Sequence, residues 1–145
     1  MREILFRAKR VKNNQWVEGS YHKHETRQVC PYGDKLSPDE IKHLIIRDTF
    51  ADWNMPREIE ATEVLPDTIG QYTGLTDKNG KRIFDGDIIE YFGEQYQVIW
   101  KNDEATFSIA LGNNEYCYFD DLDSNLSAVI GNVYDNPEMQ LEKEH

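Results

Sequence analysis

This 145-residue sequence has few of the features that mark secreted or membrane proteins. It contains two cysteines, so we expect reduced thiols rather than a disulfide framework. No apolar run approaches the ~20 residues that a membrane-spanning helix needs. The first residues do not form a signal peptide. We therefore expect a cytoplasmic protein that does not contact a membrane.

Positive charge is also scarce, since 16 basic residues stand against 27 acidic ones and the net charge is −11. The electrostatic field of such a negative protein repels a nucleic-acid phosphate backbone unless the basic residues gather on one face. Several bases do lie near the N-terminus, but a solvated face explains them more simply. We do not expect nucleic acid as a direct partner, and the acidity favours solubility or a basic partner.

Signatures of catalysis and of cofactor binding are missing as well. The sequence has no phosphate-binding Walker A loop, no dinucleotide fingerprint, no CxxC and no HxxxH. Cys30 and Cys117 are candidate nucleophiles, but neither lies at a helix start or in a glycine elbow. We therefore expect no enzyme activity and no cofactor.

The N-terminal half contains alternating patterns that are typical of β-strands. They predict a hairpin from residues 2–10 and 16–22, to which residues 25–30 could add a strand. Ser37-Pro38-Asp39-Glu40 has the form of a helix start. We favour a strand over residues 43–47 instead, because Ile45-Ile46 is β-branched and the segment is short. A further strand is expected over residues 57–64.

The stretch from Gln71 to Gly93 holds the clearest turn signals in the chain. Asn79-Gly80 lies between two apolar segments and predicts a type I′ hairpin turn. Gly86 breaks the chain again before a short apolar strand. Because glycine and aspartate are common in turns, local geometry explains most of this stretch.

Short strands separated by turns continue from Gln71 to Tyr134. Their spacing predicts a small closed or half-closed barrel, and GDIIEYFGEQYQVIW resembles the opening strands of SH3-like barrels. We expect a mainly β protein in which an N-terminal β-hairpin subdomain (1–70) packs on a C-terminal SH3-like barrel (71–137). Residues 138–145 form a charged tail.

Two sets of side chains could hold a metal. Asp77, Asp85, Asp87 and Glu90 offer the oxygen ligands that Mg²⁺ and Ca²⁺ prefer, but their spacing does not fit an EF-hand. His22 and His24 share one face of a strand and could bind Zn²⁺ with Cys30 and His43. We favour turn capping for the acids and predict no metal site, although the pattern alone leaves both sets open.

Aromatic residues are the remaining candidates for function, because they often anchor protein interfaces. Most of them should be core residues. A strand over residues 116–119 cannot direct four large side chains inward. We therefore predict an interface that includes Trp53, Trp100, Tyr116, Tyr118 and Phe119.

Four segments resemble the YopX family: MREILFRAKR, NQWVEGSYH, QYTGLTDKNGKRIFDGDIIEY and VIGNVYDNPEM. The resemblance implies a phage or prophage protein of mostly β structure, with no known catalytic or binding residues to transfer. We expect a non-enzymatic protein–protein interaction or self-assembling module that forms a homo-oligomer and has a possible host or phage partner. The alternatives are a regulator or inhibitor of a host nucleic-acid enzyme, or a carboxylate–metal enzyme.

Overall fold

The computed structural model describes residues 3–50, 52–111, 115–118 and 123–139. Its described residues form antiparallel strands and short 3₁₀ turns, and the chain is mainly β, as the sequence predicts. None of its described helical turns is long and apolar enough to cross a membrane. The chain divides into two compact units, Ile4–Ile69 and Gly70 onward, the second of which also includes Glu3.

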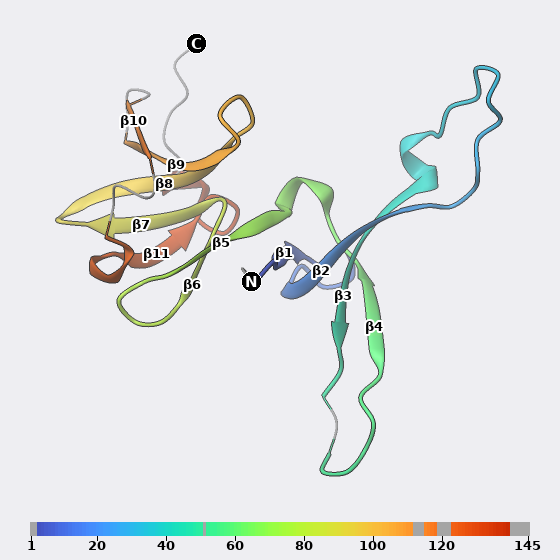
Figure 1. Ribbon diagram of the computed structural model, residues 1–145, viewed down its shortest axis with the longest axis horizontal. Helices are drawn as coiled ribbons and strands as arrows, with labels where there is room; N and C mark the ends of the chain where they lie inside the picture. Colours follow the sequence, from blue (N-terminus) through green and yellow to red (C-terminus); the bar gives the residue numbers. More distant parts are fainter. Residues whose placement is uncertain (1–2, 51, 112–114, 119–122, 140–145) are drawn as a thin grey trace. The chain divides into compact units, whose positions relative to one another are not determined.

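The N-terminal unit is a meander of four strands with the order β4-β3-β2-β1. Their bounds are Phe6–Lys9 for β1, Trp16–Glu25 for β2, Ile41–Asp48 for β3 and Ile59–Glu63 for β4. Two 3₁₀ turns, Pro38–Glu40 and Pro66–Thr68, precede β3 and follow β4. Figure 1 shows β3 and β4 continuing together into a long hairpin loop.

The core of this unit is small. The alternation of each strand brings Ala8, Val17 and Ile45 to one face of the sheet, where they pack with Val64. Phe6 and Tyr21 close the edge of this cluster. The strand favoured over residues 43–47 is present as part of β3, and the helix start at Ser37 becomes a single 3₁₀ turn.

Residues 25–30 do not add the strand that their pattern suggested, because β2 ends at Glu25. The Arg27 guanidinium donates two hydrogen bonds to Asp34, at 2.6 and 3.1 Å, and one to Glu40 at 3.0 Å. Asp34 in turn accepts from the backbone N–H of Cys30. These ion pairs raise the pKa of Arg27 and lower that of Asp34. The segment is therefore held as a loop by charge rather than by strand pairing.

The described residues of the C-terminal unit form seven strands. They are β5 (Gly70–Thr76), β6 (Arg82–Phe84), β7 (Asp87–Tyr91), β8 (Glu94–Lys101), β9 (Thr106–Leu111), β10 (Glu115–Tyr118) and β11 (Ala128–Asn132). Five of them form a sheet with the order β10-β9-β8-β7-β11 (Figure 1). Short 3₁₀ turns, Ser124–Leu126 and Pro137–Met139, precede and follow β11.

The sequence predicted a closed or half-closed barrel, and the closed form is wrong for the part of the chain that the structure describes. Strands β10 and β11 lie at opposite edges of the five-stranded sheet and do not pair with each other. Strands β5 and β6 pair with one another as a hairpin instead of bridging those two edges. The hydrogen-bonded ladder therefore stays open.

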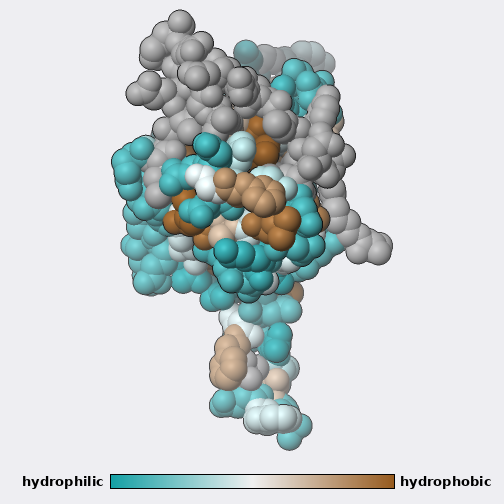
Figure 2. All heavy atoms as spheres, turned by 90° about the vertical axis from the view of Figure 1, so that its left-hand side faces the viewer, coloured by the Kyte–Doolittle hydropathy of each residue, from teal (hydrophilic) through white to brown (hydrophobic). Residues whose placement is uncertain are grey.

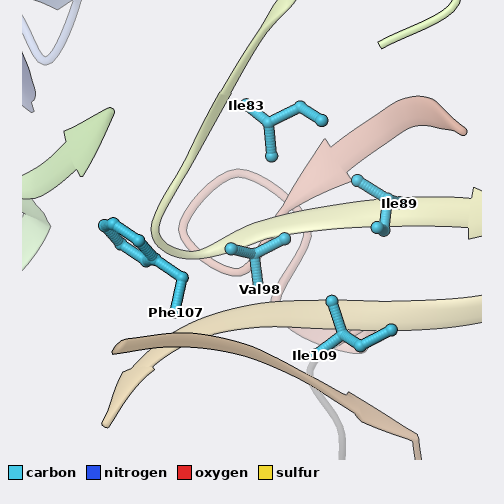
Figure 3. Packing of buried hydrophobic residues seen from close by; sticks show 5 residues of the cluster. All are labelled: Ile83, Ile89, Val98, Phe107 and Ile109. Carbon is cyan, nitrogen blue, oxygen red and sulfur yellow. The ribbon is translucent and has the colours of Figure 1, made fainter. Parts of the chain in front are cut away.

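Alternate residues of neighbouring strands build the core of this unit (Figure 3). Ile89 of β7, Val98 of β8 and Ile109 of β9 point to one side, where Ile83 and Phe107 meet them. Burial of each of these side chains contributes about 1.5–3 kcal/mol. The alternation of residues 105–111 predicts that Ala105, Phe107, Ile109 and Leu111 point inward. Phe107 and Ile109 do, whereas Ala105 precedes β9 and is exposed, and the Leu111 side chain lies outside the described residues.

The hairpin turns are not distributed as the sequence suggested. Asn79 keeps a negative φ, and only Gly80 adopts the left-handed region, at +79°. The Gly80 N–H donates to the Asp77 carbonyl, so the loop is a type I turn followed by a left-handed glycine. The type I′ turn lies instead at Phe92-Gly93, between β7 and β8, where φ is +51° and +80°.

Candidate functional site

The acidic residues of the stretch from Gln71 to Gly93 hold the backbone together. Asp77 is 3% exposed, and its two oxygens accept hydrogen bonds from the backbone N–H groups of Asn79, Lys81 and Val129 at 2.8–2.9 Å. Burial alone would raise the pKa of this carboxyl, but the three hydrogen bonds and the Lys81 charge together lower it. Asp77 is therefore an ionised anchor between the β5–β6 turn and β11.

The other acids of this stretch do not converge on one point. Asp87 and Glu90 are three residues apart on β7, so they lie on opposite faces of that strand. Asp87 accepts from the Phe84 N–H at 2.8 Å, and Asp85 accepts from the Trp100 N–H at 3.2 Å. Across the described part of the chain, no three His, Cys, Asp or Glu side chains gather where they could hold a metal.

The histidines divide between the two faces of the N-terminal sheet. His22 and His24 share the exposed face, with ring centroids 6.2 Å apart. His43 pairs in register with Lys23, which puts it on the opposite face. There its Nδ1 lies 2.6 Å from the Tyr21 hydroxyl. The strand pairing thus separates His43 from the other two.

The predicted aromatic residues lie in different settings. Trp100 is 41% exposed; its ring packs edge-on against Phe107, and its Nε1–H donates to Asn102 at 2.6 Å. Tyr116 and Tyr118 belong to β10, whose backbone is described while these side chains are not. Phe119 lies outside the described residues.

Trp53 occupies the most exposed apolar segment of the N-terminal unit. It is 95% exposed in the loop that joins β3 to β4, and Phe50 in the same loop is 91% exposed. Met55 and Ile59 follow, and both are well over half exposed. We call the segment of residues 49–58 the apolar loop. Its large apolar side chains are exposed to solvent, and the loop is connected to the sheet through β3 and β4.

Hydrogen bonds hold the apolar loop at its base and at its tip. At the base, the N–H and hydroxyl of Thr49 donate to the Glu58 carbonyl, and the Glu58 N–H returns to the Thr49 hydroxyl. At the tip, the Met55 N–H donates to the Asp52 carbonyl at 3.1 Å. Asn54 completes that turn with φ of +65°, a conformation that asparagine tolerates well.

The side chains of the apolar loop surround a shallow pocket of about 450 Å³. Its lining combines apolar and charged groups: Phe50, Asp52, Trp53, Met55 and Arg57. The interface predicted from the sequence includes Trp53 of this loop but not the neighbouring Phe50, Met55 and Ile59. The sequence does contain a signal for this cluster: Phe50, Trp53 and Met55 lie close together between two predicted strands, in a segment without strand-like alternation.

A second exposed apolar region lies in the C-terminal unit. Phe92, at the tip of the β7–β8 hairpin, is 77% exposed, and Leu126 is 53% exposed. Glu90 of β7 pairs with Ala128 of β11. Because the two strands are antiparallel, Phe92, two residues after Glu90, and Leu126, two residues before Ala128, lie at the same end of the sheet. Figure 2 shows apolar side chains gathered among hydrophilic ones on one face of this unit.

Comparison with solved structures supports the fold. The crystal structure of protein EF1440 from Enterococcus faecalis matches with a TM-score of 0.54 at 21% sequence identity. The match covers 96% of this chain and 99% of the other. At this level of identity the likeness concerns the fold alone.

Comparison at the level of sequence gives two results. No curated protein matches this chain. The family model described as YopX protein matches residues 5–141. Because that match spans nearly the whole sequence, the protein belongs to the YopX family.

Proposed function

We propose that this protein is a non-enzymatic binding module of a phage or prophage, active in the bacterial cytoplasm, and that its apolar loop docks into another protein. The observation that carries this proposal is the exposure of Phe50, Trp53 and Met55 on one hydrogen-bonded hairpin loop. We propose in addition that the C-terminal sheet is an open variant of the SH3-like fold.

The energetics favour insertion of the apolar loop into a cleft. Burial of each large apolar side chain contributes about 1.5–3 kcal/mol, before the cost of association is subtracted. A loop of ten residues held at its base and tip loses little conformational entropy on binding. Trp is also among the residue types that most often dominate binding energy at protein interfaces.

The charge around the apolar loop indicates what the partner offers. Within residues 48–58 the acidic side chains are Asp48, Asp52 and Glu58, and Arg57 is the basic one. Arg47, just before this segment, lies 3.6 Å from Glu60. The whole chain carries −11. A cleft with an apolar floor and a basic rim would complement this loop. A second copy fits less well, because it brings the same negative charge and a loop–loop contact is small against the ~800 Å² per partner of a stable interface.

Site-specific photocrosslinking in a bacterial host that carries the phage tests this proposal. A photoreactive amino acid replaces Trp53 in one strain and Tyr32 in a matched control. Tyr32 is 93% exposed in the other long loop of the same unit. We expect one defined partner to be captured from position 53 and not from position 32.

The captured partner is then purified and titrated with wild-type protein and with the triple variant F50S/W53S/M55S. We expect the triple variant to bind at least ~100-fold more weakly, because hot-spot residues each contribute about 2 kcal/mol or more. Equal capture at both positions, or equal affinity of the variant, would contradict the proposal. Capture of a second copy would replace it with the self-assembly that the sequence also suggested.

A further inference from the structure

Two histidines lie side by side on strand β2, outside the apolar loop. His22 and His24 are two residues apart, so their side chains project from the same face of the strand. Both are exposed, and their ring centroids lie 6.2 Å apart with the ring planes 33° from parallel. The sequence left open whether they hold a metal. The structure keeps this pair together, although it places His43 on the opposite face.

Strand pairing fixes the backbone beneath the two imidazoles. Both histidines pair in register with residues of β3. The pairing continues past His24, because the Thr26 N–H donates to the Glu40 carbonyl at 2.9 Å. Neither histidine therefore lies at a frayed strand end. The orientation of each ring depends on rotation about its own side-chain bonds, while the spacing of the pair is set by the strand.

Two imidazoles at this spacing can hold one metal ion between them. A Zn–N bond is about 2.0–2.1 Å long, so the two ligating nitrogens of a tetrahedral site lie about 3.3 Å apart. Rings whose centroids are 6.2 Å apart reach that separation when their outer nitrogens turn toward each other. Because both side chains are exposed, this rotation displaces no core residue.

The donor atoms and the surrounding charges select the class of ion. Imidazole nitrogen suits late first-row divalent ions such as Ni²⁺, Cu²⁺ and Zn²⁺, whereas Mg²⁺ and Ca²⁺ prefer oxygen. On the same face of the sheet, Lys42 is opposite His24 and disfavours a cation, while Glu63, opposite Leu44, favours one. The net charge of −11 on the whole chain attracts cations.

We propose that His22 and His24 bind one late transition-metal ion between them on the exposed face of β2. Across the described residues, no third His, Cys, Asp or Glu side chain gathers with them as a metal ligand. The site is therefore an open one in which water fills the remaining coordination positions, unlike the closed four-ligand sites that stabilise folds. It is separate from the apolar loop, and neither proposal requires the other.

The test titrates the isotope-labelled full chain with Ni²⁺, which is paramagnetic, and with Mg²⁺ as the oxygen-preferring control. We expect Ni²⁺ to broaden the amide signals of His22, His24 and their cross-strand partners on β3 before those of other residues. Calorimetry then gives the dissociation constant of each ion. Mg²⁺ should bind at least ~100-fold more weakly than Ni²⁺, because imidazole is a poor ligand for it.

The variants His22→Gln and His24→Gln each leave a single imidazole on this face. We expect either one to weaken Ni²⁺ binding at least ~tenfold, because the second imidazole of a pair binds intramolecularly at a high effective concentration. The matched control His43→Gln changes the histidine on the opposite face and should bind Ni²⁺ as the wild type does. Because positions 22 and 24 are exposed, both variants should unfold at the urea concentration of the wild type.

Four results would overturn this proposal. They are unbroadened His22 and His24 signals at millimolar Ni²⁺, equal affinities for Ni²⁺ and Mg²⁺, unchanged Ni²⁺ affinity in either single variant, and broadening centred on Cys30. The last result would assign the metal to an exposed thiol instead of the imidazole pair.

Discussion

Two connecting regions of this molecule reverse the usual relation between polarity and burial. The β5–β6 turn is rich in polar residues, yet its Asp77 is 3% exposed and binds three backbone N–H groups. The apolar loop between β3 and β4 is rich in large apolar residues, yet Trp53 is 95% exposed. An acidic residue can therefore be a buried part of the fold, whereas large apolar residues can stay exposed in a loop.

The largest effect should come from removal of the Asp77 carboxylate. We expect Asp77→Ala to destabilise the fold by about 3–5 kcal/mol, because it leaves three backbone donors without their acceptor in a buried place. Urea denaturation measures the change. The matched control is Asp103→Ala at an exposed turn position, which should change the free energy of unfolding by less than ~0.5 kcal/mol. If the two variants changed the free energy of unfolding equally, the Asp77 carboxylate would not be a structural anchor.

Phe92 is a large apolar residue that is exposed within the otherwise polar turns of the stretch from Gln71 to Gly93. It adopts φ of +51° at the tip of the β7–β8 hairpin, where an aromatic residue is strained, and 77% of it is exposed. We expect Phe92→Asn to stabilise the protein by about 1 kcal/mol, because asparagine suits a type I′ turn. Thermal unfolding would show the gain. A loss of stability would mean that the Phe92 ring, which contacts Tyr91 edge-on, contributes more than the strain costs.

The smallest effect on stability should come from the apolar loop. We expect each of Phe50→Ser, Trp53→Ser and Met55→Ser to change the free energy of unfolding by less than ~0.5 kcal/mol, because these side chains are exposed. Ile45→Ala, at a fully buried position of β3, should cost about 2–5 kcal/mol in the same urea titration. If the loop variants approached the cost of Ile45→Ala, the loop would be structural rather than available to a partner.

Local pattern predicted much of the strand content and the hairpin of β1 with β2, but not the ends of the strands or the pairings between segments farther apart. The alternation of residues 105–111 correctly placed Phe107 and Ile109 inward in β9, but it also placed Ala105 inward, which is exposed. Residues 25–30, which follow a strand and could extend it, form a loop instead, because Arg27 binds Asp34 and Glu40. These ion pairs join residues that are 7 and 13 positions apart in the sequence. A search for residues that alternate with a period of two cannot detect them.

The candidate site was predicted only in part. The sequence pointed to Trp53 as a loop aromatic, but it gave the same weight to Trp100, which packs against Phe107. Both tryptophans stand near polar residues and turns in the sequence. The strand pairings distinguish them: Phe107 of the neighbouring strand partly covers Trp100, whereas no described strand covers Trp53.

Local sequence pattern specifies a mainly β chain with turns rich in glycine and aspartate, and the family match over residues 5–141 makes it a member of the YopX family. Alternation along a strand and the φ preferences of turn residues are local properties, so they can be read from neighbouring positions. The tertiary structure decided that Asp77 would meet the Val129 N–H, 52 residues away, and that β4 would keep an open edge beside an exposed loop. These features depend on the register between distant strands, which no local pattern specifies.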